Sequence, residues 1–217
     1  MSAAELLAEH DRLFVTYARG LTAAKWQQPS LCESWNTHQV LAHLVVGYSM
    51  PPRKLVTAMA AHRGNFNCAN AAVADRLASQ HTPDELIGTF ERLIGRPEGI
   101  GKAFPSRLLL GDHVLHHLDI ALALGHPPSI PGHIVDAVLD TEVHIPNPFV
   151  PAKRNAGGLT LTATDTGWRF ATRAGHRVEG EAIYLAAALA GRTCALRALS
   201  GDGVPRLERR ITCRTDD

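Results

Sequence analysis

The sequence predicts a mainly α-helical protein, with a helical bundle at residues 1–148 followed by a small α+β domain at residues 149–217. Three observations support this fold class. Apolar residues recur at spacings of three and four as far as about residue 144, which is the period of an amphipathic helix. Alternating apolar and polar residues replace that period in the last third of the chain, which indicates strands. Between the two patterns lie several prolines, which end helices: Pro146, Pro148 and Pro151.

Composition narrows the class of protein. The chain has 217 residues, of which 45% are hydrophobic and 20% charged, as is usual for a globular protein of one or two domains. Its net charge of +1 gives no electrostatic reason to expect a nucleic acid or a membrane as partner, and no apolar run approaches a membrane span. Four cysteines without a CxxC pair are typical of free thiols, so we expect a cytoplasmic protein.

The first helices are expected at residues 3–27, with a break at Gly20, and from Asn36 or Thr37 to about Ser49. Asn36 followed three residues later by Gln39 is a capping-box pattern that begins the second of these helices. Pro51 and Pro52 end it. His43 then lies among apolar neighbours two turns into this helix, so we expect it to face the protein interior.

The middle of the chain predicts five further helical segments. Thr82-Pro83-Asp84-Glu85 combines a cap residue, a proline in the first turn and an early acid, which begins a helix ending near Gly95. A glycine and two prolines end another helix after residue 124. Residues 96–103 form a loop. The expected helices cover residues 54–61, 65–79, 83–94, 105–125 and 131–144.

The α+β domain is expected to begin with a β-hairpin. Residues 158–165 and 167–174 alternate apolar and polar side chains around Asp165-Thr166-Gly167, a typical hairpin turn. Residues 176–179 add a third strand. A helix at 181–190, one or two turns at 193–199 and an edge strand at 204–211 complete the domain.

The expected helix at 105–125 carries three ionisable side chains on one face. Asp112, His116 and Asp119 stand at i, i+4 and i+7, which places them side by side on a helix. A carboxylate and an imidazole one turn apart are spaced to hold one metal ion. Helices of a bundle can direct such groups toward a shared centre, so His43 is the expected third ligand. Two imidazoles and one carboxylate leave positions for water and substrate, as a catalytic zinc requires.

A structural interpretation of the same residues stays open. His43 can be a hydrogen-bonded core histidine, and Asp112 with His116 a pair on a helix face. Asp119 can be a fourth ligand, an acceptor that orients a ligating imidazole, or a partner for an arginine or a loop backbone.

Other reactive side chains have simpler expected roles. His113 and His117 lie about 100° or more around the helix from Asp112, so we expect them in solvent or in a contact between helices. Cys32 has no base placed near it by the sequence. We expect a small buried thiol there, with a nucleophile as the alternative.

Three motifs carry a resemblance to a known family. The segment WNTHQVLAHLVVG at residues 35–47 precedes the pattern D-x-x-x-H-x-x-D-x-x-x-A-L-G at residues 112–125. The run LxxALAGRxxxLxxLSGDG follows at residues 185–203. Together they resemble the mycothiol-dependent maleylpyruvate isomerase family within the DinB/YfiT-like metalloenzymes. The resemblance spans most of the chain.

This resemblance implies an up-down-down-up four-helix bundle that holds one divalent metal ion, usually zinc. The implied ligands are His43, Asp112 and His116. The family usually has glutamate where this chain has Asp112. Because aspartate is one methylene shorter, the ion must lie closer to that helix, or a water must intervene.

The resemblance also implies a reaction. A thiol held by the ion loses its proton near neutral pH, and the thiolate is the nucleophile. In the isomerase members, mycothiol adds to the cis double bond of maleylpyruvate. Rotation and elimination then give fumarylpyruvate, while other members transfer the thiol sulfur. Arg192 and Arg197 are candidates to bind the substrate carboxylates, with surface charge at a helix end as the alternative.

We therefore expect an enzyme, a mycothiol-dependent isomerase or S-transferase, with zinc and mycothiol as cofactors and a small electrophile as substrate. A non-catalytic binding or regulatory module with a structural or vestigial metal is the first alternative, and a metal-dependent hydrolase is the second. Pairing into a homodimer is left open.

Overall fold

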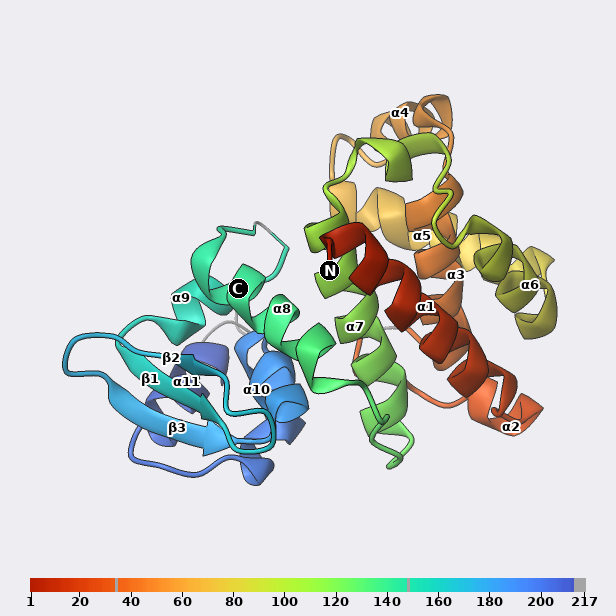
Figure 1. Cartoon of the computed structure of the whole chain (residues 1–217). Coiled ribbons are helices and arrows are strands. Elements are labelled where there is room, and N and C mark those ends of the chain that lie inside the picture. The colour runs from red at the N-terminus through yellow and green to blue at the C-terminus, as the bar shows by residue number, and fades with distance from the viewer. Residues whose placement is uncertain (34, 148, 213–217) are drawn as a thin grey trace. The chain divides into compact units, whose positions relative to one another are not determined.

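The computed structural model describes residues 1–33, 35–147 and 149–212, which fall into two compact units, Met1–Pro128 and Ser129–Asp217 (Figure 1). Helices build the first unit, and helices with a small sheet build the second, so the predicted mainly α-helical class is confirmed. The units divide before helix α8 (Gly132–His144), whereas the sequence analysis placed this helix with the bundle. Helix α8 has a buried face that includes Val135 and Leu139, and it packs on α9 (Ala152–Ala156) and α10 (Ala182–Leu189) of the second unit.

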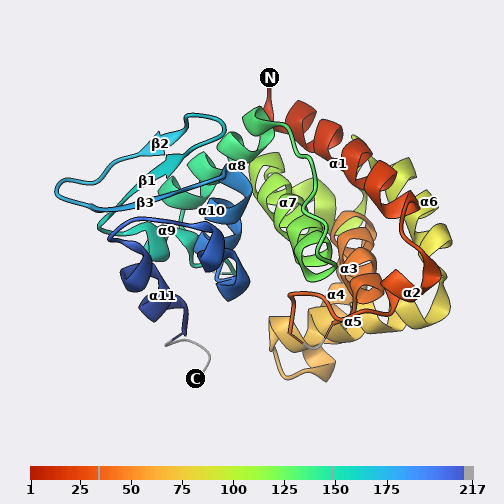
Figure 2. The same ribbon diagram turned by 90° about the horizontal axis from the view of Figure 1, so that it is seen from below.

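The first unit is built from helices, and each helix predicted for it is present, while the loop predicted at residues 96–103 contains a short 3₁₀ helix. Figures 1 and 2 show α1, α3, α6 and α7 running alongside one another, and both α1 and α3 pack against α6 and α7. The buried side chains of these four helices include Phe14, Leu41, Phe90 and Leu118. The elements are α1 (Ala3–Arg19), α2 (Ala23–Trp26), α3 (Thr37–Ser49), α4 (Pro52–Ala61), α5 (Phe66–Gln80), α6 (Pro83–Leu93), the 3₁₀ helix η1 (Gly99–Ala103) and α7 (Ser106–Ala123).

Local sequence fixes where these helices begin. Asn36 accepts a hydrogen bond from the Gln39 backbone, and the Gln39 side chain accepts one from the Asn36 backbone, so the predicted capping box begins α3. Thr82 and Glu85 form the same motif at α6. The long N-terminal helix is interrupted after Arg19, as the glycine at position 20 predicted. These boundaries fix the rotation of α3 and therefore the direction of His43.

The second unit combines a three-stranded sheet with helices. Strand order is β2-β1-β3, with β1 antiparallel to β2 and parallel to β3. Alternate residues of β1 are buried, which confirms the apolar–polar alternation used to predict the strands. Besides α8, the elements are α9 (Ala152–Ala156), β1 (Leu159–Ala163), β2 (Arg169–Phe170), β3 (His176–Gly180), α10 (Ala182–Leu189), η2 (Thr193–Ala198) and α11 (Val204–Thr212).

The edge strand predicted at residues 204–211 is wrong, because this segment is helix α11. Leu207 and Ile211 are four residues apart and both buried, while Glu208 and Arg209 between them are exposed. Pro205 lies in the first turn, where a helix tolerates proline. In the part of the chain that the structure describes, no helix is both long and apolar enough to span a bilayer.

Candidate metal centre

The facing sides of α3 and α7 bring His43, Asp112 and His116 together. Asp112 Oδ2 lies 3.7 Å from His43 Nε2, and Asp112 Oδ1 lies 3.5 Å from His116 Nε2. The two imidazole centroids are 4.6 Å apart. Each residue offers one ligand atom, and the three atoms lie within 4.8 Å of one another. The helix packing therefore supplies the meeting point that the sequence could not show.

These separations fit a divalent metal ion. Tetrahedral zinc with bonds of 2.0–2.2 Å separates its nitrogen and oxygen ligands by about 3.3–3.6 Å. Each imidazole lies close to that distance from one oxygen of Asp112, His43 from Oδ2 and His116 from Oδ1. The shorter aspartate side chain thus reaches both imidazoles. The Asp112 side chain is 40% exposed and each imidazole 13%, so solvent reaches the group, as a site with exchangeable positions requires.

The surrounding groups shift the pKa values of Asp112 and His116. Burial disfavours a charged Asp112, but the positive charge and hydrogen bond of His116, together with the hydrogen bond from His43, hold the pKa of Asp112 well below its usual range. Burial also disfavours a charged His116, yet Cys32 and Asp112 outweigh it and raise the pKa of His116 well above its ordinary value. A proton on Nε2 of His116 therefore takes the position that a metal ion would occupy.

Asp119 orients the His116 ring. Its side chain is fully buried, and Oδ2 lies 3.0 Å from His116 Nδ1. The backbone N–H of Leu31 donates to the Asp119 carbonyl oxygen at 3.1 Å. Donation from Nδ1–H to this carboxylate leaves Nε2 directed toward Asp112. This contact is the one expected if Asp119 orients a ligating imidazole. That Asp119 supports metal binding in this way remains a prediction.

His43 is held by a residue that the sequence analysis missed. Nδ2 of Asn70, on α5, lies 3.1 Å from His43 Nδ1, and the Trp35 ring lies 5.2 Å from the imidazole. Ligation through Nε2 requires a proton on Nδ1, so the Asn70 amide must present Oδ1 to it. Asn70 stands in an alanine-rich stretch with no motif, and only the pairing of α3 with α5 reveals it.

Cys32 is also part of this region. Its Sγ lies 2.9 Å from Asp119 Oδ2 and 3.4 Å from His116 Nδ1. The side chain is half-buried rather than the small buried thiol that we expected. Cys32, His116 and Asp119 form a second group whose ligand atoms lie within 4.8 Å of one another. The sequence places no base near Cys32 because the contact joins a loop to α7 across 84 residues.

The other histidines of α7 face α1. His113 Nδ1 lies 2.8 Å from Asp11 Oδ1, and His117 Nδ1 lies 3.3 Å from His10 Nε2. Both histidines are buried. Of the two expected surroundings, solvent is excluded and the contact between helices is confirmed.

The predicted substrate-binding arginines belong to the second unit. Arg192 Nη1 donates to the Ala190 carbonyl oxygen at 2.8 Å, and Arg197 is exposed. Their role in binding a substrate remains a prediction.

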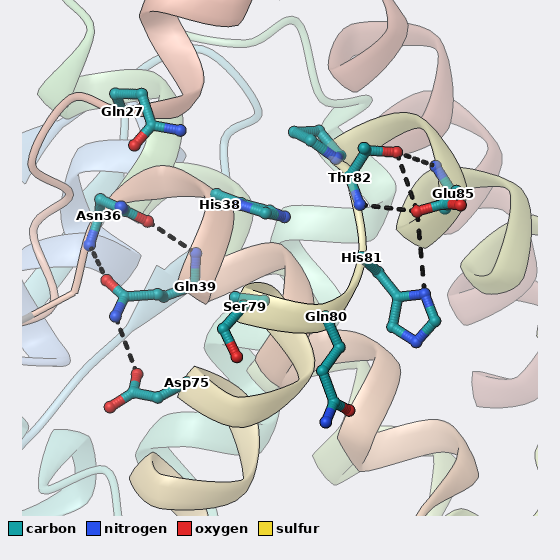
Figure 3. A pocket seen from close by; sticks show the side chains of 12 residues that line it. Gln27, Asn36, His38, Gln39, Asp75, Ser79, Gln80, His81, Thr82 and Glu85 are labelled. Carbon is teal, nitrogen blue, oxygen red and sulfur yellow. Dashed lines mark hydrogen bonds and ion pairs between the residues drawn. The ribbon is translucent and has the colours of Figure 1, made fainter.

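A polar hollow of about 560 Å³ lies beside α3, α5 and the start of α6 (Figure 3). Amides, hydroxyls and carboxylates line it, and Gln39 Nε2 donates to Asp75 Oδ1 at 2.9 Å across it. His38 contributes a buried imidazole whose Nε2 has no hydrogen-bond partner in residues 1–33, 35–147 and 149–212. The hollow is separate from the candidate metal centre, because its lining includes none of the three proposed ligands.

Two imidazoles and a carboxylate from facing helices define a helical-bundle protein with a candidate metal centre. Residues 6–98 match the family model of the mycothiol maleylpyruvate isomerase N-terminal domain. This match supports the resemblance seen in the sequence. The matched segment contains α3 with His43 and ends before α7.

Two solved structures share the fold. One is a crystal structure of the mycothiol-dependent maleylpyruvate isomerase, with a TM-score of 0.54 at 15% identity. The other is a histidine-to-alanine mutant of the isomerase of that name, with a TM-score of 0.56 at 16% identity. Each comparison covers 92% of this chain and 91% of the other. No curated protein sequence matches the chain.

Proposed function

We propose that the protein is a metal-dependent enzyme that uses a low-molecular-weight thiol, mycothiol, as the nucleophile on a small electrophile. The reaction is the isomerisation of a maleylpyruvate-like substrate or the transfer of the thiol sulfur. The observation that carries this proposal is the convergence of His43, Asp112 and His116 on one point. The family of the N-terminal segment supports the choice of thiol.

A divalent ion, when bound, lowers the pKa of a thiol that it holds and so supplies the thiolate near neutral pH. His43 and His116 would hold the ion through Nε2, and Asp112 through its carboxylate. Asp119 keeps the proton on Nδ1 of His116 and so keeps Nε2 available. Three protein ligands leave at least one position for the thiol. Nitrogen and oxygen donors in this number suit zinc.

The test compares turnover with and without each component. Purified protein is assayed for conversion of maleylpyruvate to fumarylpyruvate and for transfer of the mycothiol sulfur to an electrophile. We expect turnover to require both zinc and mycothiol, and to fall at least 100-fold in His43→Ala and His116→Ala because each loses a ligand. His126→Ala is the matched control, since this histidine is exposed after the end of α7.

Two other outcomes would contradict the proposal. Turnover of an ester or amide without mycothiol would indicate a hydrolase that uses bound water on the same ligands. A chelator that lowers the melting temperature sharply, in a zinc-loaded protein with no thiol-dependent turnover, would indicate a structural ion in a binding module.

A further inference from the structure

The two ring nitrogens of His116 face two different groups of potential metal ligands. Nε2 faces Asp112, whereas Nδ1 faces Cys32 and Asp119. We propose that Cys32 Sγ, Asp119 Oδ2 and His116 Nδ1 form a second ion position, which takes thiophilic divalent cations such as Cd²⁺. The inference shares His116 with the proposed function and is otherwise independent of it.

The three ligand atoms lie within hydrogen-bonding distance of one another. The three atoms form a triangle with sides of 2.9, 3.0 and 3.4 Å. Zinc bonds of about 2.0–2.3 Å in tetrahedral geometry separate the ligand atoms by about 3.3–3.8 Å, and the longer bonds of Cd²⁺ separate them further. Hydrogen bonds now hold the atoms closer than that, so the ligand atoms must move apart when an ion replaces those hydrogen bonds.

The backbone keeps Cys32 in this place. The Cys32 N–H donates to Ser30 Oγ at 3.1 Å, and the Ser30 hydroxyl donates to the Trp35 carbonyl oxygen at 2.9 Å. Leu31 is tied to α7 through the carbonyl oxygen of Asp119 itself. The thiol is therefore presented to the carboxylate by a hydrogen-bonded turn.

The chemistry of the donors selects the ion. Thiolate is a soft ligand that favours thiophilic metals, whereas the group on the Nε2 side offers nitrogen and oxygen alone. On binding, the Cys32 S–H bond and the Nδ1–H bond break. Both protons pass to water as metal–sulfur and metal–nitrogen bonds form, and Asp119 supplies a further negative charge.

The two positions exclude each other. A neutral imidazole has one nitrogen lone pair available at a time. An ion on Nδ1 of His116 leaves the proton on Nε2, where it faces Asp112 and blocks the first position. A thiophilic ion is therefore expected to displace zinc.

The experiment is a Cd²⁺ titration of the full chain, followed by the ultraviolet sulfur-to-cadmium charge-transfer band. We expect a saturable band in the wild type that is retained in His43→Ala and is lost in Cys32→Ser, Cys32→Ala and His116→Ala. Cys68→Ser is the matched control, because Cys68 is exposed and lies on α5. Near-ultraviolet circular dichroism identifies any variant that fails to fold, and two different Cys32 substitutions guard against such a failure.

The inference is overturned if the wild type shows no band, or if folded Cys32→Ser and Cys32→Ala keep it. In zinc-loaded protein, one equivalent of Cd²⁺ should release zinc from the wild type and at least tenfold less from Cys32→Ser. Binding of both ions together would overturn the mutual exclusion. The band does not depend on turnover, so it survives if the proposed enzyme activity is absent.

Discussion

Asp119 Oδ2 lies 3.0 Å from Nδ1 of His116, while the other nitrogen of the same ring lies 3.5 Å from Asp112. The buried carboxylate is thus placed to accept a hydrogen bond from Nδ1–H of His116, which would leave Nε2 for an ion. We therefore expect Asp119 to affect the metal affinity of the candidate centre through the orientation of His116.

Substitution of Asp119 tests this link. Asp119→Asn removes the negative charge that favours Nδ1–H, and Asp119→Ala removes the acceptor altogether. Loss of such a partner typically lowers metal affinity about 10–100-fold, and we expect the alanine variant to be the weaker binder. Zinc affinity measured by competition with a chromophoric chelator checks this. Unchanged affinity in both folded variants would show that Asp119 does not orient His116 toward an ion.

Asn70 offers a substitution that should strengthen binding. Asn70→Asp provides a carboxylate that can only accept from His43 Nδ1–H, which leaves the Nε2 lone pair for an ion. Asn70→Leu removes the partner. The same chelator competition should rank aspartate above asparagine and asparagine above leucine. The reverse order would mean that Nε2 of His43 is not the ligand atom.

The other face of α7 is expected to matter for stability. Burial alone would raise the pKa of Asp11, but the charge of His113 and hydrogen bonds from His10 and His113 outweigh it and lower the pKa to about 2. The Tyr48 hydroxyl donates to the other carboxylate oxygen. Asp11→Ala leaves these buried partners unsatisfied and should cost about 3–5 kcal/mol in the free energy of unfolding. Tyr48→Phe should cost about 1–3 kcal/mol.

Urea unfolding at pH 7 measures the loss of unfolding free energy in Asp11→Ala and in Tyr48→Phe. Because the pKa of Asp11 is lower in the folded state than in the unfolded chain, its contribution is present above about pH 4 and is lost as the pH falls toward 2. Zinc content should stay unchanged, since this cluster contains none of the proposed ligands. A folded Asp11→Ala protein as stable as the wild type would contradict a stabilising role for the cluster.

Glu142 predicts a pH dependence in the second unit. Burial raises the pKa of Glu142 to about 8 although Arg192 lowers it, and neither carboxylate oxygen has a hydrogen-bond partner among the described residues. The folded state therefore holds a proton that the unfolded state releases above about pH 4.5. The free energy of unfolding should fall by up to about 1.4 kcal/mol per pH unit as the pH rises from the unfolded-state pKa of Glu142 to its folded-state pKa, and then level off.

Glu142→Gln removes the ionisation and keeps the shape of the side chain. We expect this variant to gain stability relative to the wild type as the pH rises from 5 to 8, with little difference at pH 4. Thermal unfolding across this range provides the measurement. Parallel pH profiles for the two proteins would show that Glu142 does not carry the raised pKa.

Local patterns predicted most of the fold, and the reasons are visible in particular residues. Asn36 with Gln39, and Thr82 with Glu85, are short-range capping signals that need no tertiary information. The segment at 204–211 was wrongly predicted as a strand, because the apolar–polar patterns of a short amphipathic helix and of an edge strand differ little over eight residues. The burial of Leu207 and Ile211, four positions apart, fits the period of a helix rather than that of a strand.

Some residues of the candidate site could be predicted from local sequence patterns, and others could not. Asp112 and His116 share a helix face, so their spacing alone pairs them, and a bundle was enough to suggest His43. Asn70 and Cys32 join the group through contacts between distant segments, with no local pattern to mark them. Helix packing, rather than spacing, assembles the surroundings of each imidazole.

The zinc content of the purified protein tests the central claim most directly. Elemental analysis after expression with added zinc should find close to one ion per chain in the wild type and in His126→Ala. Close to none is expected in His43→Ala, Asp112→Ala or His116→Ala, because each substitution removes one of three proposed ligands. A folded wild type without metal, or a fully loaded His43→Ala variant, would contradict the account.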